Sequence, residues 1–184
     1  KDKIRKYGIA PWAINETCNR IIDLLKDHKF EKAIYNMGVL GHYISDLHMP
    51  LHTAINYNGQ FSGNDGIHFR WEERLVNKYI HKIKPIGKIE KVEDPWTFAM
   101  KIVKESFKVH HQLLDADTKA RSLLTKEQAK ELNTYKILSF EKPYLDVLYT
   151  ETETLLKDRL GRSVIRLASL WQYCWEQAGS PDLP

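Results

Sequence analysis

The sequence predicts an all-α fold in which several helices pack as a multi-helix bundle. Apolar residues recur three and four positions apart over most of the chain, a spacing typical of helices with one buried face. No segment alternates apolar and polar residues as a half-buried strand does. The chain has 184 residues, 42% of them hydrophobic, which is enough for one substantial core and gives no argument for two. We therefore expect a single domain over residues 1–184.

The N-terminal part is expected to form two helices joined by a short polar turn. The first begins at Pro11 and covers residues 11–25, with apolar side chains three and four apart on one side. The second covers residues 31–50. It ends or bends at Pro50, because proline has no amide hydrogen to donate and clashes with the preceding turn.

The middle of the chain is expected to contain a loop, a helix and a long connection. Glycine, asparagine and serine residues predict a loop over residues 55–65. Either Asn64 or Asp65 can cap the helix that follows, which covers residues 67–81. The lysine-rich segment 82–93 is expected to be a solvated connection.

The C-terminal part is expected to form three more helices. Asp94 and Pro95 are a strong cap and first-turn pair for a helix that reaches about residue 114. A short helix covers residues 125–133, and a long last helix covers residues 139–178. On that last helix we expect a buried stripe of Leu160, Val164, Leu167, Trp171, Cys174 and Ala178, with Trp175 also in the core.

The composition excludes several classes of protein. The formal net charge of +4 is mild, and the charged residues, 28% of the chain, are mixed in sign, so extensive disorder is not expected. The two cysteines, Cys18 and Cys174, form no Cys-x-x-Cys pair, which excludes a thiolate zinc knuckle. No run of about 18 apolar residues occurs, so no membrane-spanning helix is expected.

Histidines and carboxylates occur at a spacing that suits metal binding. Three of the eight histidines lie in the stretch Gly-His-Tyr-Ile-Ser-Asp-Leu-His-Met-Pro-Leu-His at residues 41–52. There His42 and Asp46 are four residues apart, and His68 and Glu72 repeat that spacing. Positions four apart share a helix face, so each pair can direct an imidazole and a carboxylate at one metal ion. These ligands suit zinc, whose catalytic sites commonly have three protein ligands and an open position.

His52 is the fifth candidate ligand. It lies beyond Pro50, and its side chain is expected to point in a different direction around the helix axis from that of Asp46. We therefore expect His52 to belong to a different site. His48 departs from the four-residue spacing and is expected to lie outside the ligand set, as an outer-shell or surface residue. The predicted metal ligands are His42, Asp46, His52, His68 and Glu72.

Other patterns that would indicate metal or nucleophilic chemistry are absent. The sequence has no His-Glu-x-x-His peptidase motif and no Glu-x-x-His pairs of the kind found in diiron bundles. It has no Gly-x-Ser-x-Gly elbow, no P-loop, no Gly-x-Gly-x-x-Gly and no adjacent His-Asp dyad. The five predicted ligands are therefore the main chemical signal in this sequence.

In this arrangement the sequence resembles the zinc-dependent phospholipase C and single-strand-specific nuclease superfamily. The matching residues are His42-x3-Asp46-x5-His52 and His68-x3-Glu72, separated by a loop rich in glycine and asparagine. The resemblance extends from about residue 9 to the C-terminal Leu-Ala-Ser-Leu-Trp-x-Tyr-x-Trp-x-x-Ala-Gly. It implies an all-α bundle of that family's type with up to three zinc ions, two of which form a close pair bridged by a carboxylate.

The resemblance also assigns the ligands to individual zinc ions. His52, His68 and Glu72 would form the separate third site. His42 would bind one metal of the pair, and Asp46 would bridge both. The family's other ligands come from an N-terminal Trp, a His soon after it, and an Asp and a His ahead of the first helix, and none of these is matched here. We expect them in an upstream segment, and we expect a secreted or periplasmic protein, since a free N-terminal Trp requires signal removal.

With the metal pair complete, the resemblance implies phosphodiester hydrolysis by metal-activated water that attacks phosphorus, with His42 and Asp46 as the catalytic residues. The substrate would be a phospholipid or a single-stranded nucleic acid. Glu72 stands where family members also have Asp and favours the phospholipase branch. The nuclease branch needs an aromatic pocket that stacks bases. The candidates for it are Tyr57, Phe61, Phe69 and Trp71, of which two or more are expected to pack in the core instead.

Two alternatives stay open at this point. One is a non-catalytic helical domain that a single zinc ion at His52, His68 and Glu72 stabilises. The other is a hydrolase that uses the same three residues to hold one metal ion and a water molecule. Metal content and the effect of replacing His42 distinguish these alternatives from the three-metal enzyme.

Overall fold

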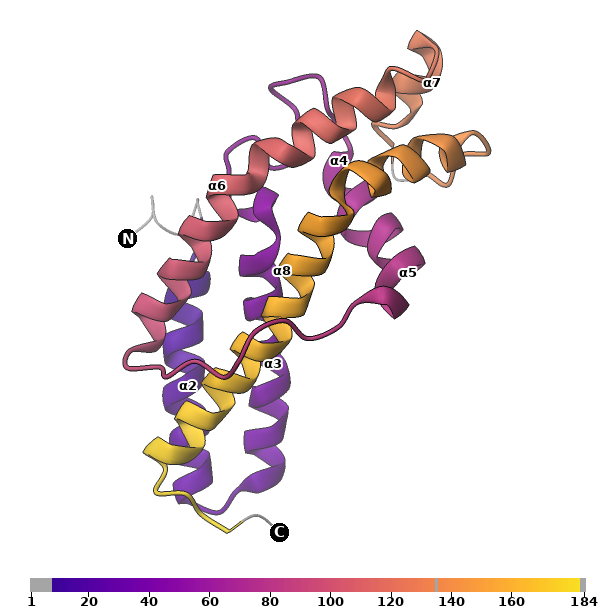
Figure 1. Cartoon of the computed structure of the whole chain (residues 1–184). Coiled ribbons are helices and arrows are strands. Elements are labelled where there is room, and N and C mark those ends of the chain that lie inside the picture. Colours follow the sequence, from indigo (N-terminus) through magenta and orange to yellow (C-terminus); the bar gives the residue numbers. More distant parts are fainter. Residues whose placement is uncertain (1–7, 135, 183–184) are drawn as a thin grey trace. The chain divides into compact units, whose positions relative to one another are not determined.

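The computed structural model describes residues 8–134 and 136–182, and every regular element in those ranges is helical, with no strand (Figure 1). The predicted all-α class is confirmed. Within the same ranges, no helix is long and apolar enough to cross a membrane. The chain divides into two compact units. The expectation of one domain over residues 1–184 stays a prediction.

The first unit contains the described residues up to His48, the segment Pro85–Lys104 and the residues from Gly161 onward. Its helices are α2 (Ala10–Lys26), α3 (Phe30–His48), the first part of α6 (Pro95–Arg121) and the last part of α8 (Glu141–Gln177). The helices α2 and α3 lie side by side (Figure 1). The apolar stripes predicted for these two helices form most of the core, which includes Ile14, Cys18, Ile21, Leu40, Ile44, Ile102 and Leu170.

The second unit contains Met49–Lys84 and Glu105–Leu160. Besides the remaining parts of α6 and α8, its elements are η1 (Pro50–Thr53), α4 (Ile67–Phe69), η2 (Arg70–Leu75), α5 (Val76–Tyr79), η3 (Ile80–Lys82) and α7 (Lys126–Glu131). Four of these, α4, η2, α5 and η3, follow one another without a break, and η2 is a π-helix. They correspond to the helix predicted over residues 67–81. The core of this unit includes Leu51, Ile67, Trp71, Leu75, Leu113, Tyr144 and Leu148.

The predicted starts of α6 and α7 are confirmed by their capping bonds, whereas α8 begins at Glu141, two residues after its predicted start. At the start of α6, the Thr97 amide donates to Asp94 Oδ2 over 2.7 Å. At the start of α7, Thr125 and Gln128 form a reciprocal capping box. The α6 helix continues past the predicted end at residue 114 to Arg121, where its side chain takes part in the polar network described below.

The buried face of the last helix differs from the predicted stripe. Val164 and Trp171 are 47% and 38% exposed, and Trp175 is 36% exposed, so these three residues are not core residues. Besides Gly161, five positions in this part of α8 are buried: Ser163, Arg166, Ser169, Leu170 and Cys174. The prediction was wrong because it assigned the inner face to apolar residues alone, whereas three of these five are polar or charged.

Candidate metal centre

Three of the five predicted ligands, His52, His68 and Glu72, come together in the second unit. One donor atom from each lies within 4.8 Å of the others. The two Nε2 atoms are 3.1 Å apart, and Glu72 Oε2 lies 3.4 Å from that of His52 and 2.6 Å from that of His68. Tetrahedral zinc with bonds of about 2.0–2.1 Å separates its ligand atoms by roughly 3.3 Å. Two of the three distances therefore match a zinc triangle, and the shortest, 2.6 Å, would have to lengthen by about 0.7 Å.

The three donor residues come from separate short elements. His52 belongs to η1, the single helical turn that begins at Pro50 and is closed by a bond of 2.7 Å from Thr53 Oγ1 to the Pro50 carbonyl. His68 lies in α4 and Glu72 in the π-helical turn that follows. Isolated π turns of this kind are frequent at functional sites.

Gly66 makes the turn that leads into His68. Its φ of +87° lies in the left-handed region, and a Cβ at this position would be 2.3 Å from the Leu132 carbonyl oxygen. Only glycine can meet both conditions without moving the backbone. The sequence suggested that Asn64 or Asp65 caps this helix, but Gly66 is the cap residue, and its amide donates to Asn58 Oδ1 over 3.2 Å. The Asn64 side chain bonds to α6 instead.

The protonation pattern of the cluster suits a cation. His68 Nδ1 lies 3.1 Å from the Tyr57 carbonyl, which can only accept, so Nδ1 carries the hydrogen. In a neutral imidazole the Nε2 atom then has a lone pair, and it cannot donate to the Glu72 carboxylate 2.6 Å away. Either an extra proton or a metal ion has to sit between these atoms. A backbone carbonyl that accepts from Nδ1 is also the usual partner that fixes the tautomer of a metal-binding histidine.

The Glu72 carboxylate is ionised over most of the pH range. Burial raises the pKa of Glu72, but when the Nε2 atoms of His52 and His68 carry a hydrogen, their hydrogen bonds outweigh burial and hold the pKa at about 2. The side chains of the cluster remain open to solvent, with exposed fractions of 26% for each histidine and 40% for the glutamate. Two imidazoles and an ionised carboxylate on the solvent-exposed side of these elements could hold a metal ion.

Acid is expected to remove a stabilising contribution of Glu72 from the metal-free protein. Because its folded pKa of about 2 lies below the ordinary 4.5, this contribution is complete above about pH 4.5 and is lost as the pH falls toward 2. Thermal unfolding of the chelator-treated wild type and of Glu72→Gln between about pH 6 and about pH 3 measures it. The difference in Tm should shrink as the pH falls; a constant difference would contradict the expectation.

The other two predicted ligands, His42 and Asp46, form a pair on α3 in the first unit. His42 Nε2 is 3.3 Å from Asp46 Oδ2, as their four-residue spacing predicted, and the side chains are 72% and 30% exposed. Within the described residues, the cluster of His52, His68 and Glu72 is the one group of three or more such donors whose ligand atoms come together. A metal at His42 and Asp46 would therefore need further donors.

His48, which was expected to be an outer-shell or surface residue, is 1% exposed. Its Nδ1 lies 2.7 Å from the Ile44 carbonyl, and its Nε2 lies 3.2 Å from a guanidinium nitrogen of Arg166. A carbonyl only accepts and a guanidinium only donates, so His48 is neutral with its hydrogen on Nδ1. Arg166 in turn pairs with Glu90 over 3.2 Å. These bonds join α3, α8 and the connection before α6 inside the first unit.

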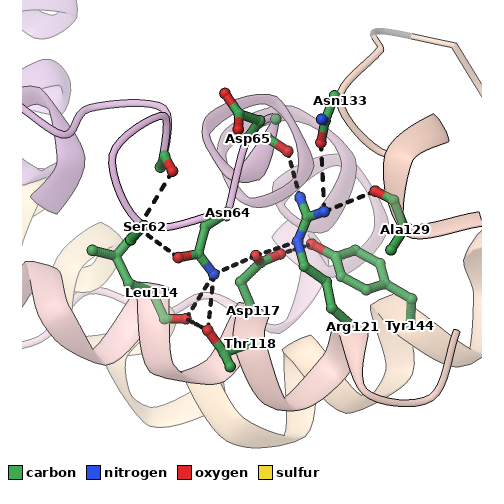
Figure 2. Close-up of polar contacts among 12 residues, drawn as sticks. Ser62, Asn64, Asp65, Leu114, Asp117, Thr118, Arg121, Ala129, Asn133 and Tyr144 are labelled. Atoms are coloured by element: carbon green, nitrogen blue, oxygen red, sulfur yellow. Dashed lines mark hydrogen bonds and ion pairs between the residues drawn. The ribbon is translucent and has the colours of Figure 1, made fainter. Parts of the chain in front are cut away.

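A buried polar network, which no sequence pattern predicted, holds the end of the loop that precedes His68 (Figure 2). The Asn64 amide donates to Asp117 Oδ2 over 2.7 Å and to the Leu114 carbonyl over 3.1 Å. Arg121 also pairs with Asp117, over 2.6 Å, and donates to the Asp65 carbonyl. These bonds fix Asn64 and Asp65 to α6. The partners are more than 50 positions apart in the sequence, so no local spacing could reveal them.

No protein-family model, no curated protein and no solved structure gives a significant match to this chain.

Proposed function

We propose that this chain is a zinc-dependent phosphodiester hydrolase of the phospholipase C and single-strand nuclease type. The observation that carries the proposal is the cluster of His52, His68 and Glu72, whose donor atoms lie 2.6–3.4 Å apart. In the family that the sequence resembles, these positions hold the zinc ion that is separate from the metal pair.

The pair of His42 and Asp46 supports the same assignment. Their side chains point at each other over 3.3 Å from one face of α3. The resemblance gives them the paired metals, with Asp46 as the bridging ligand. Further donors would complete that pair, and the resemblance places those donors ahead of the first helix.

The residues of the cluster would prepare the site for a metal. The Tyr57 carbonyl holds the hydrogen of His68 on Nδ1 and leaves the Nε2 lone pair for a metal. Glu72 supplies one negative charge, which reduces the net charge of a bound dication. When bound, zinc ions would polarise phosphoryl oxygens and lower the pKa of water toward neutrality. Phosphodiester hydrolysis needs both effects.

The test compares variants of the intact protein in hydrolysis of a chromogenic phosphodiester. His42→Ala and Asp46→Asn are each expected to lower kcat at least about 100-fold, because the loss of even an outer-shell partner costs about 10- to 100-fold. Asp23→Asn, a change at an exposed position of α2, is the matched control and should retain wild-type activity. Wild-type activity in both His42→Ala and Asp46→Asn would refute the assignment.

A second candidate function is favoured by one observation. Within the described residues, His52, His68 and Glu72 form a complete donor set, whereas His42 and Asp46 offer two ligands. This arrangement fits a non-catalytic helical domain stabilised by one zinc ion. The zinc content of the intact protein separates the two functions, since about three zinc ions per chain support the enzyme and about one supports the structural role.

A further inference from the structure

The loop that joins His52 to His68 exposes three large apolar side chains. Ile55 and Phe61 are each 73% exposed, and Tyr57 is 55% exposed. Residues 53–64 contain no Asp, Glu, Lys or Arg, although charged residues make up 28% of the whole chain. An uncharged segment with several exposed apolar side chains is the composition expected of an interaction surface. We call residues 53–64 the apolar loop.

Side-chain hydrogen bonds give the apolar loop a defined conformation. The Phe61 amide donates to Asn56 Oδ1 over 2.8 Å, and the Gln60 side chain donates to the Ile55 carbonyl over 2.9 Å. Asn56 also donates to Ser62 Oγ over 2.9 Å. These bonds bring the two sides of the loop together, so Ile55 and Phe61 project from neighbouring stretches of backbone. A surface that is already ordered loses little conformational entropy when a partner binds.

The apolar loop is in direct contact with the cluster of His52, His68 and Glu72 through Tyr57 and His68. The Tyr57 carbonyl accepts from His68 Nδ1 over 3.1 Å, and the two rings meet edge to face with centroids 6.2 Å apart. A partner bound to this loop would therefore lie beside the donor atoms.

We propose that Ile55, Tyr57 and Phe61 dock the protein on a bilayer of zwitterionic phospholipid. Ile55 and Phe61 enter the boundary between head groups and acyl chains, while Tyr57 stays at the level of the head groups, where an aromatic ring with a polar tip is favoured. This inference rests on the proposed function, because it places phospholipid, rather than nucleic acid, in front of the metal cluster.

The charge of the loop decides between these two partners. Proteins that stack single-stranded bases on aromatic side chains also line the path of the phosphates with Lys and Arg. Residues 53–69 contain neither, and their one charged residue, Asp65, is acidic. Aliphatic Ile55 offers no face for stacking. A zwitterionic lipid surface needs no cationic groups, and an uncharged loop can enter it without a desolvation penalty for charge.

The experiment is co-sedimentation of the intact protein with phosphatidylcholine vesicles. The three side chains bury no more apolar surface than a single acyl chain, which by itself binds membranes only reversibly. We therefore expect reversible binding of the protein to the vesicles. Ile55→Ser and Phe61→Ser should each weaken it roughly tenfold, and the double variant should not bind measurably. Ile137→Ser is the matched control, because Ile137 is 75% exposed in the same unit but lies outside the loop. It should bind as the wild type does. Wild-type zinc content in all variants would show that the donor set is intact.

Three results would overturn the docking surface. The first is absence of vesicle binding by the wild type, and the second is vesicle binding by the double variant equal to that of the wild type. The third is binding of a single-stranded oligonucleotide, but not vesicles, that the loop variants weaken. Vesicle binding requires no catalysis and is measured with and without chelator. Failure of the docking is thus distinguished from failure of the proposed hydrolase, which the zinc content and the chromogenic assay report separately.

Discussion

Replacing His68 by alanine is expected to lower the zinc affinity of the protein about 100- to 1,000-fold. Structural zinc sites with four ligands bind with roughly 10–16 kcal/mol, so one ligand accounts for about 2.5–4 kcal/mol. His68 is the central member of the cluster, since its Nε2 lies 3.1 Å from that of His52 and 2.6 Å from Glu72 Oε2. Without it, His52 and Glu72 are left as two donors on different short elements, with no third such donor beside them in the described residues.

Calorimetric titration with zinc in the presence of a competing chelator measures this affinity. A second measurement is the rise in Tm on adding zinc, because an ion that binds only the folded state stabilises it by mass action. His81→Ala is the control: His81 is an exposed histidine of the same unit and lies outside the cluster. Wild-type affinity in His68→Ala would mean that zinc binds elsewhere, and the structural basis of the proposed function would be lost.

The two pairs with four-residue spacing could be predicted from the sequence because helix periodicity alone determines them. His42 with Asp46, and His68 with Glu72, each lie within one helical stretch and have the expected contact. The place of His52 could not be derived in this way. Sixteen positions separate it from His68, and its position depends on the conformation of the intervening loop. Only the family resemblance assigned it to the same metal.

The parts of the fold that could not be predicted depend on polar residues with distant partners. Periodicity placed the buried face of α8 on its apolar residues, yet Arg166 is 2% exposed and Val164 is 47% exposed. Arg166 is buried because Glu90, 76 positions earlier, and His48, 118 positions earlier, accept its hydrogen bonds. The spacing of residues along the sequence identifies neither partner. The same holds for Asn64. Its sequence position predicted a cap for the adjacent helix, whereas its side chain bonds to Asp117 on α6.

Replacing Arg121 by methionine is expected to destabilise the folded protein by about 3–5 kcal/mol, the usual cost of removing one partner from a buried ion pair. The Asp117 side chain is fully buried, and Arg121 Nε is the cation beside it, 2.6 Å from Oδ2. The Tyr144 hydroxyl and the Asn64 amide also donate to this carboxylate, over 2.5 and 2.7 Å (Figure 2). Without Arg121, two neutral donors would remain to stabilise a buried negative charge. Urea unfolding of both proteins measures the difference.

The destabilisation of Arg121→Met should decrease as the pH is lowered. Burial raises the pKa of Asp117 above its ordinary value, and Arg121 is the largest influence that lowers it. Loss of this cation would raise the pKa further. In the variant, the folded state then binds a proton more tightly than the unfolded state, so stability rises as the pH falls through that range. Protonated Asp117 carries no charge and needs no cation.

An exposed ion pair between α6 and α8 provides the control. Lys119 Nζ and Glu151 Oε1 are also 2.6 Å apart, but their side chains are 62% and 32% exposed. Because water screens such a pair, Lys119→Met should change the unfolding free energy by less than about 1 kcal/mol. Equal effects of the two substitutions would show that burial of Asp117 does not govern the stability of the network. The anchoring of Asn64 and Asp65 to α6 would then need another explanation, and so would the placement of His68 beside His52.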